Sequence, residues 1–323
     1  MSALAAATAP RAGRRPRALW PTWRLHRTAL LTSAAVLLAL VGALLFTGLR
    51  IRQSYREIGL DACLPACGDA QLSAFALQAQ RWGLWTQFLA LLPGLLGMFV
   101  GAPLVAREYE AGTFRFAWTQ AVTPRRLLLT KVALLGSALL AATLGFSAFF
   151  HWWYTPIAAI KDRIAPWPYH ADGVYLAAAT LFCLALGVFA GAVLRRTVVA
   201  MFVTGAAWVG VFLLDWYALR PRYAAPILAA ADTHGLGHGG RAWVVDSWVV
   251  DPAGHRLSEA EWNAILALHA NDRTWTQGDY RTWVLYEPGE RFWQFQAIDA
   301  AWLTAAAALL VLATLWWLRR RPT

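Results

Sequence analysis

Six long apolar runs separated by polar segments dominate the pattern of hydrophobic and polar positions along the chain. None of the runs contains Asp, Glu, Lys, Arg or His, and each is close to the roughly 20 residues that an α-helix needs to cross a bilayer. The runs are residues 29–49, 84–106, 132–150, 174–194, 197–214 and 300–318. This pattern predicts an all-α polytopic membrane protein with six transmembrane helices.

The polar stretches divide the chain further. Residues 1–28 predict a basic tail followed by a short helix in the membrane interface. The first run is longer than a signal-peptide core and lacks a small-residue cleavage site, so we expect it to be retained as a span. The predicted divisions are a tail at 1–28, spans one to five at 29–215 with a cytoplasmic loop at 107–126, an extracytoplasmic domain at 216–296, and the last span with a basic end at 297–323.

Composition and charge agree with a membrane location. Hydrophobic residues make up 59% of the chain and charged residues 15%, which is too apolar for an ordinary soluble domain. With the N-terminus inside, sixteen of the 29 Lys and Arg residues but only two of the 18 Asp and Glu residues lie on the inner side. This bias predicts that both termini are cytoplasmic. The basic residues lie at the ends of apolar runs rather than on one face, which argues against nucleic-acid binding.

The absence of ionisable residues from the six runs bears on mechanism. Proton-coupled carriers place such groups at membrane depth, so a proton-driven carrier is disfavoured. No Gly-x-x-x-x-Gly-Lys-Ser/Thr phosphate-binding loop occurs, so if ATP drives this protein another chain must bind it. The sequence also lacks a catalytic or metal-ligand constellation, and we expect neither enzymatic activity nor a bound cofactor in this chain.

Residues 216–296 form the one sizeable hydrophilic region and predict a small α+β domain between spans five and six. Two similar segments rich in strand formers, 243–246 and 248–251, precede a Pro-Ala-Gly turn at 252–254. A further strand is expected at 280–286.

A helix is expected within the same region. Ser258 and Glu261 have the spacing of a capping box, which predicts a helix running to about His269. We expect the tryptophans of the region to form its core: Trp243, Trp248, Trp262, Trp275 and Trp283. Tryptophans at span ends, such as Trp152 and Trp153, are expected to anchor in the membrane interface.

Small residues and cysteines suggest further contacts. Gly97-x-x-x-Gly101 and Gly187-x-x-x-Gly191 have the spacing of close helix contacts, and packing within one chain is favoured over a subunit interface. Cys63 and Cys67 fall in a predicted outer loop, where they could form a disulfide or remain two free thiols.

The loop at 107–126 contains the only two acids on the inner side, Glu108 and Glu110. Gly112-Thr113 predicts a break followed by a short helix at about 114–121, and Thr123-Pro124 predicts the start of the third span. We expect this loop to contact a partner through some of its polar and aromatic residues: Arg107, Glu108, Glu110, Gly112, Thr113, Phe114, Trp118, Thr123, Arg125 and Arg126. The glutamates could pair with Arg107, Arg115 or Arg125, or meet basic residues of the partner.

The pattern Glu-x-Glu-x-Gly-Thr at 108–113, followed by Trp118-Thr-Gln and Thr123-Pro-Arg-Arg, resembles the loop between spans two and three of ABC-2 type ABC transporter permeases. The six-span layout is similar to that of the same family. Phe292-Trp-Gln-Phe-Gln296 before the last run resembles a bacterial branch with a large outer loop.

The resemblance implies the transmembrane permease subunit of an ABC transporter in a bacterial plasma membrane. The loop would dock on an ABC ATPase subunit that binds ATP and Mg, and a second permease subunit, identical or different, would complete the pair within membrane lipid. Export is the commoner direction in the family and is expected here. The competing hypothesis is a non-transporting membrane sensor or assembly protein that acts through its outer domain.

Overall fold

The computed structural model describes residues 19–64, 67–112, 124–231, 242–269, 272 and 279–320. The chain divides into two units, Met1–Phe46 and Thr47–Thr323. Helix α1 (Leu19–Glu57) is a single helix of 39 residues. It contains both the interfacial helix and the first span expected from the sequence, with no break between them, and it continues eight residues beyond the expected end of the span at 49.

Five helical segments in the part of the chain that the structure describes are long and apolar enough to cross a membrane. They are Ala70–Glu110, Arg125–Tyr154, Tyr175–Leu194, Thr197–Arg222 and Gly289–Arg320. These segments coincide with expected spans two to six, and the chain is therefore a multi-pass membrane protein. The expected first span at 29–49 stays a prediction.

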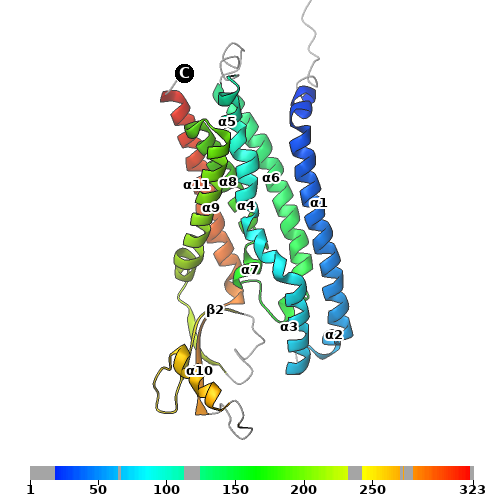
Figure 1. Ribbon diagram of the computed structural model, residues 1–323, viewed down its shortest axis with the longest axis vertical. Helices are drawn as coiled ribbons and strands as arrows, with labels where there is room; N and C mark the ends of the chain where they lie inside the picture. Colours follow the sequence, from blue (N-terminus) through cyan, green and yellow to red (C-terminus); the bar gives the residue numbers. More distant parts are fainter. Residues whose placement is uncertain are drawn as a thin grey trace, which may run out of the picture. The chain divides into compact units, whose positions relative to one another are not determined.

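The first of these segments is built from several helical pieces. It consists of α3 (Asp69–Gly83), a 3-10 stretch at Leu84–Leu91, α4 (Leu92–Leu96), a π-helical stretch at Gly97–Gly101, and α5 (Ala102–Glu110). The remaining helices of the bundle are α6 (Pro124–Tyr154), α8 (Tyr175–Leu194), α9 (Thr197–Leu214) and α11 (Phe292–Arg320). Helix α8 is the most buried of them and contacts α5, α6, α9 and α11, so it is the central helix of the bundle (Figure 1).

Glycines allow α8 to lie directly against the path from α4 to α5. A Cβ added to Gly187 would be 2.5 Å from the carbonyl oxygen of Gly97 and 2.7 Å from the backbone nitrogen of Ala102. A Cβ added to Gly97 would be 2.5 Å from the carbonyl oxygen of Cys183. The two Gly-x-x-x-Gly pairs thus pack against each other within one chain, as expected from the sequence.

The end of α1 packs on α6 through buried aromatic side chains. Trp153 is only 1% exposed, and its Nε1 donates to Thr47 Oγ1 at 2.9 Å. Arg52 donates to the carbonyl of Trp152 and lies 3.9 Å from the centre of its ring. The expectation of an interface anchor is therefore wrong for Trp153, because Gly48 leaves room for its ring against α1.

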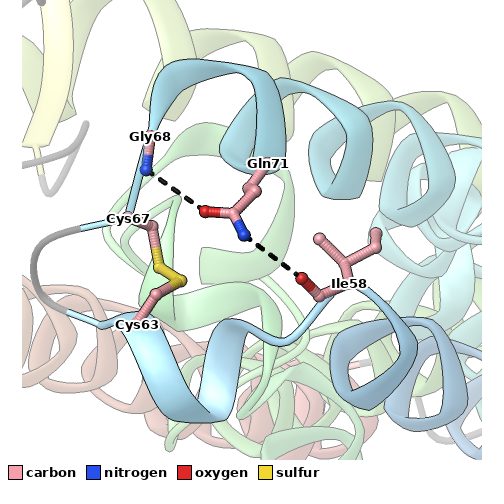
Figure 2. The surroundings of a disulfide bond; sticks show 5 residues. All are labelled: Ile58, Cys63, Cys67, Gly68 and Gln71. Atoms are coloured by element: carbon pink, nitrogen blue, oxygen red, sulfur yellow. Dashed lines mark hydrogen bonds between the residues drawn. A yellow bond between two sulfur atoms is a disulfide. The ribbon is translucent and has the colours of Figure 1, made fainter.

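A disulfide joins Cys63, at the end of the short helix α2 (Leu60–Cys63), to Cys67 (Figure 2). Gln71 reinforces the same turn from the first turn of α3. Its Oε1 accepts from Gly68 N at 3.3 Å, and its Nε2 donates to Ile58 O at 3.5 Å (Figure 2). The segment between α1 and α3 is thus held by one covalent bond and two hydrogen bonds.

A three-stranded antiparallel sheet lies at one end of the bundle. It consists of β1 (Ile227–Ala231), β2 (Ala242–Val250) and β3 (Arg281–Pro288), in the order β1-β3-β2. Helix α10 (Glu259–Leu268) begins after Ser258, whose hydroxyl accepts from Glu261 N at 3.2 Å. The expected strands, turn and capping box are confirmed, whereas β1 was missed because its Ile-Leu-Ala-Ala-Ala sequence carries little strand signal.

The tryptophans of this region do not form the separate core that we expected. Trp248, Trp262 and Trp283 are only half-buried, and α10 has no buried residue. Trp243 is buried, but it packs on Phe295 of α11. A sheet of three strands with one short helix encloses too little volume for an interior, so its best-buried tryptophan is covered by the helical bundle instead. Trp275 lies outside the described residues.

Candidate functional site

The candidate loop starts where α5 ends and finishes where α6 begins, at the end of the bundle opposite the sheet (Figure 1). Helix α5 ends at Glu110, and Gly112 has a φ of 65°, which only glycine adopts without strain. Helix α6 starts at Pro124, as the Thr-Pro signal predicts. The remaining predicted contacts of the loop and its short helix lie outside the described residues: Thr113, Phe114, Trp118 and Thr123.

An ion pair joins the two helices on either side of the loop. Lys131 of α6 donates from Nζ to Glu108 Oε1 of α5, and each side chain is about one-third exposed. Charge-assisted hydrogen bonds of this kind are stronger than those between neutral groups. Glu108 therefore holds the start of α6 against the end of α5.

Glu110 makes a second connection, to the N-terminus of α9. Its Oε1 accepts from the backbone N–H of Thr197 at 2.9 Å, and its Oε2 accepts from the Thr197 hydroxyl at 2.6 Å. The first N–H groups of a helix have no partner within it and carry partial positive charge, so a carboxylate is well placed there. Glu110 thus caps α9 from another helix.

The turn between α8 and α9 completes this junction. Arg195 has a φ of 56°, the one positive value among the non-glycine residues that the structure describes, and its guanidinium lies 4.9 Å from the centre of the Tyr109 ring. Below the turn lies a buried cluster from α5, α6 and α8: Val105, Leu128, Val188 and Ala192. Both ends of the loop are therefore anchored on tightly packed helices.

At this end of the bundle the two glutamates are bonded to other residues of the chain, whereas several arginines are exposed to solvent. Glu108 and Glu110 bond to Lys131 and Thr197, which the sequence had not indicated as partners. Exposed arginines lie at the ends of α5, α6, α9 and α11: Arg107, Arg125, Arg126, Arg196, Arg319 and Arg320. The surface that faces away from the bundle here is consequently basic.

A second polar site lies at the opposite end of α9 and α11, and sequence analysis missed it. Helix α9 continues through a π-helical stretch at Asp215–Leu219, and α11 begins eight residues before the expected span at 300. Asp215 and Asp299 are 0% exposed and Arg220 is 1% exposed. The six apolar runs themselves contain no ionisable residue, but the helices extend past the runs and include these three charged residues.

Hydrogen bonds connect the two aspartates. Tyr223 Oη lies 2.6 Å from Asp299 Oδ1 and 3.0 Å from Asp215 Oδ1. Asp299 also accepts from the Tyr169 hydroxyl through Oδ2 and from Trp302 Nε1 at 3.0 Å through Oδ1. Asp299 thus collects donors from three different segments of the chain.

Arg220 lies beside this pair. It donates to the carbonyl of Ile164, and its guanidinium lies 3.6 Å from the centre of the Tyr169 ring and 4.3 Å from that of Trp243 in β2. His170 is 1% exposed next to the same residues, and burial, assisted by Arg220, lowers its pKa to about 3. His170 is therefore neutral at physiological pH.

Gln296, the last residue of the Phe-Trp-Gln-Phe-Gln segment before the last run, makes four hydrogen bonds to the start of α8 and the turn before it. Its Oε1 accepts from the N–H groups of Val174 and Tyr175 at 2.9 and 2.7 Å, at the N-terminus of α8. Its Nε2 donates to the carbonyls of Tyr169 and Asp172 at 3.0 and 3.1 Å. A fully bonded, buried amide thus links α11 to the start of the central helix.

The sequence contained one signal for this site. Asp215 and Asp299 directly border apolar runs, so a helix of ordinary length would bring them to its buried end. Their meeting in space depends on how α9 and α11 pack, which the sequence pattern does not reveal.

The sequence model of a family described as "ABC-2 membrane transporter related" matches residues 34–220, which is more than half of the chain. No curated protein and no solved structure gives a significant match.

Proposed function

Because the chain belongs to the ABC-2 membrane transporter related family, we propose that it is the transmembrane permease subunit of an ATP-driven ABC transporter. The family match over residues 34–220 is the observation that carries this proposal, since it includes the loop after α5 and the helices around it. A separate ABC ATPase subunit binds ATP and Mg and hydrolyses the nucleotide, and this chain provides the path through the membrane.

The ATPase docks on the end of the bundle where α5 meets α6. Glu108 and Glu110 hold the helices of this end together, because both are bonded to other helices of the chain. The arginines around them supply the exposed charge, so the matching surface of the ATPase is acidic. Of the two alternatives for the glutamates, this proposal favours pairing within the chain over contact with basic residues of the partner.

The two glutamate contacts also provide a route for coupling. Movement of the loop displaces α5, and α5 is bonded to α6 through Glu108 and to the start of α9 through Glu110. A docked ATPase shifts the helices between two arrangements only to the extent that its contacts differ between them. The three joined helices then move as one body against the rest of the bundle.

The wider assignment follows the same family. Two permease chains, identical or different, form the membrane pathway in a bacterial plasma membrane, with both termini in the cytoplasm and the sheet outside. The charge bias supports this orientation, because the loop end carries most of the basic residues. Export is the proposed direction.

One observation favours the alternative of a sensor or assembly protein that acts through the outer region. Apolar side chains are exposed there, with Leu228 at 51%, Val244 at 47% and Leu268 at 80%. Exposed apolar residues in a small region are typical of a surface that binds another protein. The same surface would serve a permease whose outer region meets an envelope partner.

The experiment is co-purification of the full chain with a candidate ABC ATPase. The test variant combines Arg107→Glu, Arg125→Glu and Arg126→Glu, and the control is Arg281→Glu, an exposed arginine in the sheet at the opposite end. Wild type and control should capture the ATPase, whereas the triple variant should lose most of it because like charges would then face each other.

Two results would count against these proposals. Undiminished capture by a correctly inserted triple variant would refute arginine docking. Failure of the wild-type chain to capture a folded ATPase would refute the permease assignment and favour the sensor hypothesis.

A further inference from the structure

Two buried aspartates between α9 and α11 face the same tyrosine hydroxyl, which has one hydrogen for two carboxyl oxygens. The Tyr223 hydroxyl carries a single hydrogen, yet its oxygen lies within hydrogen-bonding distance of both Asp215 Oδ1 and Asp299 Oδ1. Burial, together with Asp299, raises the pKa of Tyr223, so the hydroxyl keeps its proton and donates it to one carboxyl only. The other contact needs a proton from a different source.

The surrounding donors show which aspartate is ionised. Asp299 accepts from Tyr169 and Tyr223, and also from the Trp302 Nε1–H, which lies 3.0 Å from Tyr223 Oη as well; these donors satisfy a buried carboxylate. Tyr169 also remains a donor, because burial and Asp299 raise its pKa. Asp299 is therefore the charged member, and the shorter contact from Tyr223, at 2.6 Å, points to it.

Asp215 lacks the donors that a buried carboxylate needs. Its Oδ2 is buried and, within the described residues, accepts no hydrogen bond, and its Oδ1 lies 3.0 Å from Tyr223 Oη beside the carboxylate of Asp299. An ionised carboxylate in this position would be unsatisfied and would repel both the hydroxyl oxygen and Asp299. A carboxylic acid instead donates its proton to Tyr223 Oη and satisfies the contact.

Charge balance supports the same assignment. Arg220 is the buried guanidinium beside the pair, and one positive charge matches one carboxylate. Two ionised aspartates would leave a net negative charge that burial makes costly, and such sites bind a proton instead. A partly satisfied Arg220, whose Nε has no hydrogen-bond partner among the described residues, does not offset a second charge.

We propose that Asp215, Tyr223 and Asp299 form a proton-binding site, in which Asp215 is the neutral acid that donates to Tyr223 and Asp299 is the carboxylate that accepts from it. Release of the proton breaks the O–H bond of Asp215, transfers H⁺ to water and leaves a second carboxylate. Water must reach the pair for this to happen, so proton release is coupled to opening of the packed site.

The proton-binding site lies next to the sheet at this end of the bundle. Tyr223 lies between the end of α9 and β1, and Trp243 of β2 covers the Arg220 guanidinium. Opening the site therefore means moving the strands away from α9 and α11. The bound proton stabilises the arrangement in which the strands lie on these helices.

Among the described residues, four other titratable groups lie near the aspartate pair. They are Arg220, Tyr169, Tyr175 and His170, contributed by the segments from α7 (Pro166–Tyr169) to α8 and by the end of α9. Tyr169 stays protonated and His170 stays neutral at neutral pH. Because all four groups are present both in wild type and in Asp215→Asn, the difference in stability between the two proteins reports the aspartate pair.

The test uses the purified full chain in detergent and compares Asp215→Asn with Asp299→Asn. The amide of Asn donates to Tyr223 as the neutral acid does, so Asp215→Asn should keep wild-type thermal stability at neutral pH. Asp299→Asn replaces one of the two acceptor oxygens by an NH2 donor and removes the charge that balances Arg220, so it should be clearly less stable. The stability of wild type relative to Asp215→Asn should fall as pH rises from about 4 toward neutrality, since the folded wild type then holds a proton on Asp215 that the unfolded chain has already lost.

Infrared spectroscopy reads the proton directly. Wild type at neutral pH should show the carbonyl stretch of a protonated carboxylic acid, which Asp215→Asn should remove and which Asp246→Asn, at an exposed position, should keep. If Asp215→Asn does not fold, Tyr223→Phe should shift the same band, because it removes the acceptor of the acid proton.

Three results would overturn the proposal. They are the absence of the acid band in wild type, a band unchanged by both Asp215→Asn and Tyr223→Phe, and greater loss of stability in Asp215→Asn than in Asp299→Asn.

Discussion

Replacing Gly187 by Ala should destabilise the bundle although alanine is the better helix former. The added Cβ would lie 2.5 Å from Gly97 O, 2.7 Å from Ala102 N and 3.0 Å from Gly101 C. All three are backbone atoms, so none can rotate away as a side chain would. Carbon atoms pack best at about 3.5 to 4.0 Å, and the helices would have to separate by roughly 1 Å.

The magnitude follows from two opposing effects. Overpacking a close-packed interior costs about 1–3 kcal/mol, and rigid backbone neighbours favour the upper end. Alanine in place of glycine stabilises a helix by about 1 kcal/mol. The net loss is about 2 kcal/mol, which corresponds to roughly 4–8 °C in melting temperature at the scaling of domains of 150–250 residues.

The matched control is Gly210→Ala on α9, where an added Cβ meets no atom within 4 Å. It should keep the propensity gain and raise the melting temperature by a few degrees. Thermal unfolding of the purified chain, followed by tryptophan fluorescence in detergent, measures both. Equal shifts in the two variants would refute the close approach of α8 to the path from α4 to α5.

Three further predictions concern buried and capping groups. Gln296→Leu should lower the free energy of unfolding by at least about 3 kcal/mol, because it leaves two N–H groups at the start of α8 without an acceptor. The control Gln294→Leu, at an exposed position, should lower it little. Equal melting temperatures for the two variants would contradict the assignment. Thr197→Val should cost about 1 kcal/mol by removing one bond to Glu110, whereas Thr304→Val, whose hydroxyl bonds to its own helix, should cost less in the same denaturation assay. His170 has a folded pKa of about 3 against about 6.5 when unfolded, so the unfolded chain binds more protons at this residue as pH falls below 6.5. The stability of wild type relative to His170→Phe should therefore fall by about 2 kcal/mol between pH 7 and 5, a difference in which the other titratable groups cancel. A difference that does not change with pH would show that the imidazole is not buried.

The two glutamates of the loop show how far local signals reach. The sequence indicated that Glu108 and Glu110 were exceptional, because they are the only acids in a basic environment. It did not indicate their partners, since Lys131 is 23 residues and Thr197 is 87 residues away along the chain. Such pairings depend on which helix ends meet, and apolar periodicity does not encode this.

In the outer region, too, local features were predictable from sequence and long-range contacts were not. Ser258 and Glu261 interact over three residues, so their capping box was predictable from sequence. The strand at Ile227–Ala231 carries little strand signal of its own, and pairing with β3 makes it a strand. The burial of Trp243 against α11 likewise required the packing of two distant segments.

The sequence by itself determined that the chain crosses a membrane several times, where the long helices lie, and that the segment after Arg107 is unusual. These properties depend on the length, polarity and local capping of single segments, which each stretch of sequence carries alone. Only the tertiary structure decided that Asp215 and Asp299 share Tyr223, and that Gln296 caps α8. Tyr223 is 76 positions from Asp299, and Gln296 is 122 positions from Val174, so these contacts exist only because α8, α9 and α11 pack closely enough to bury them.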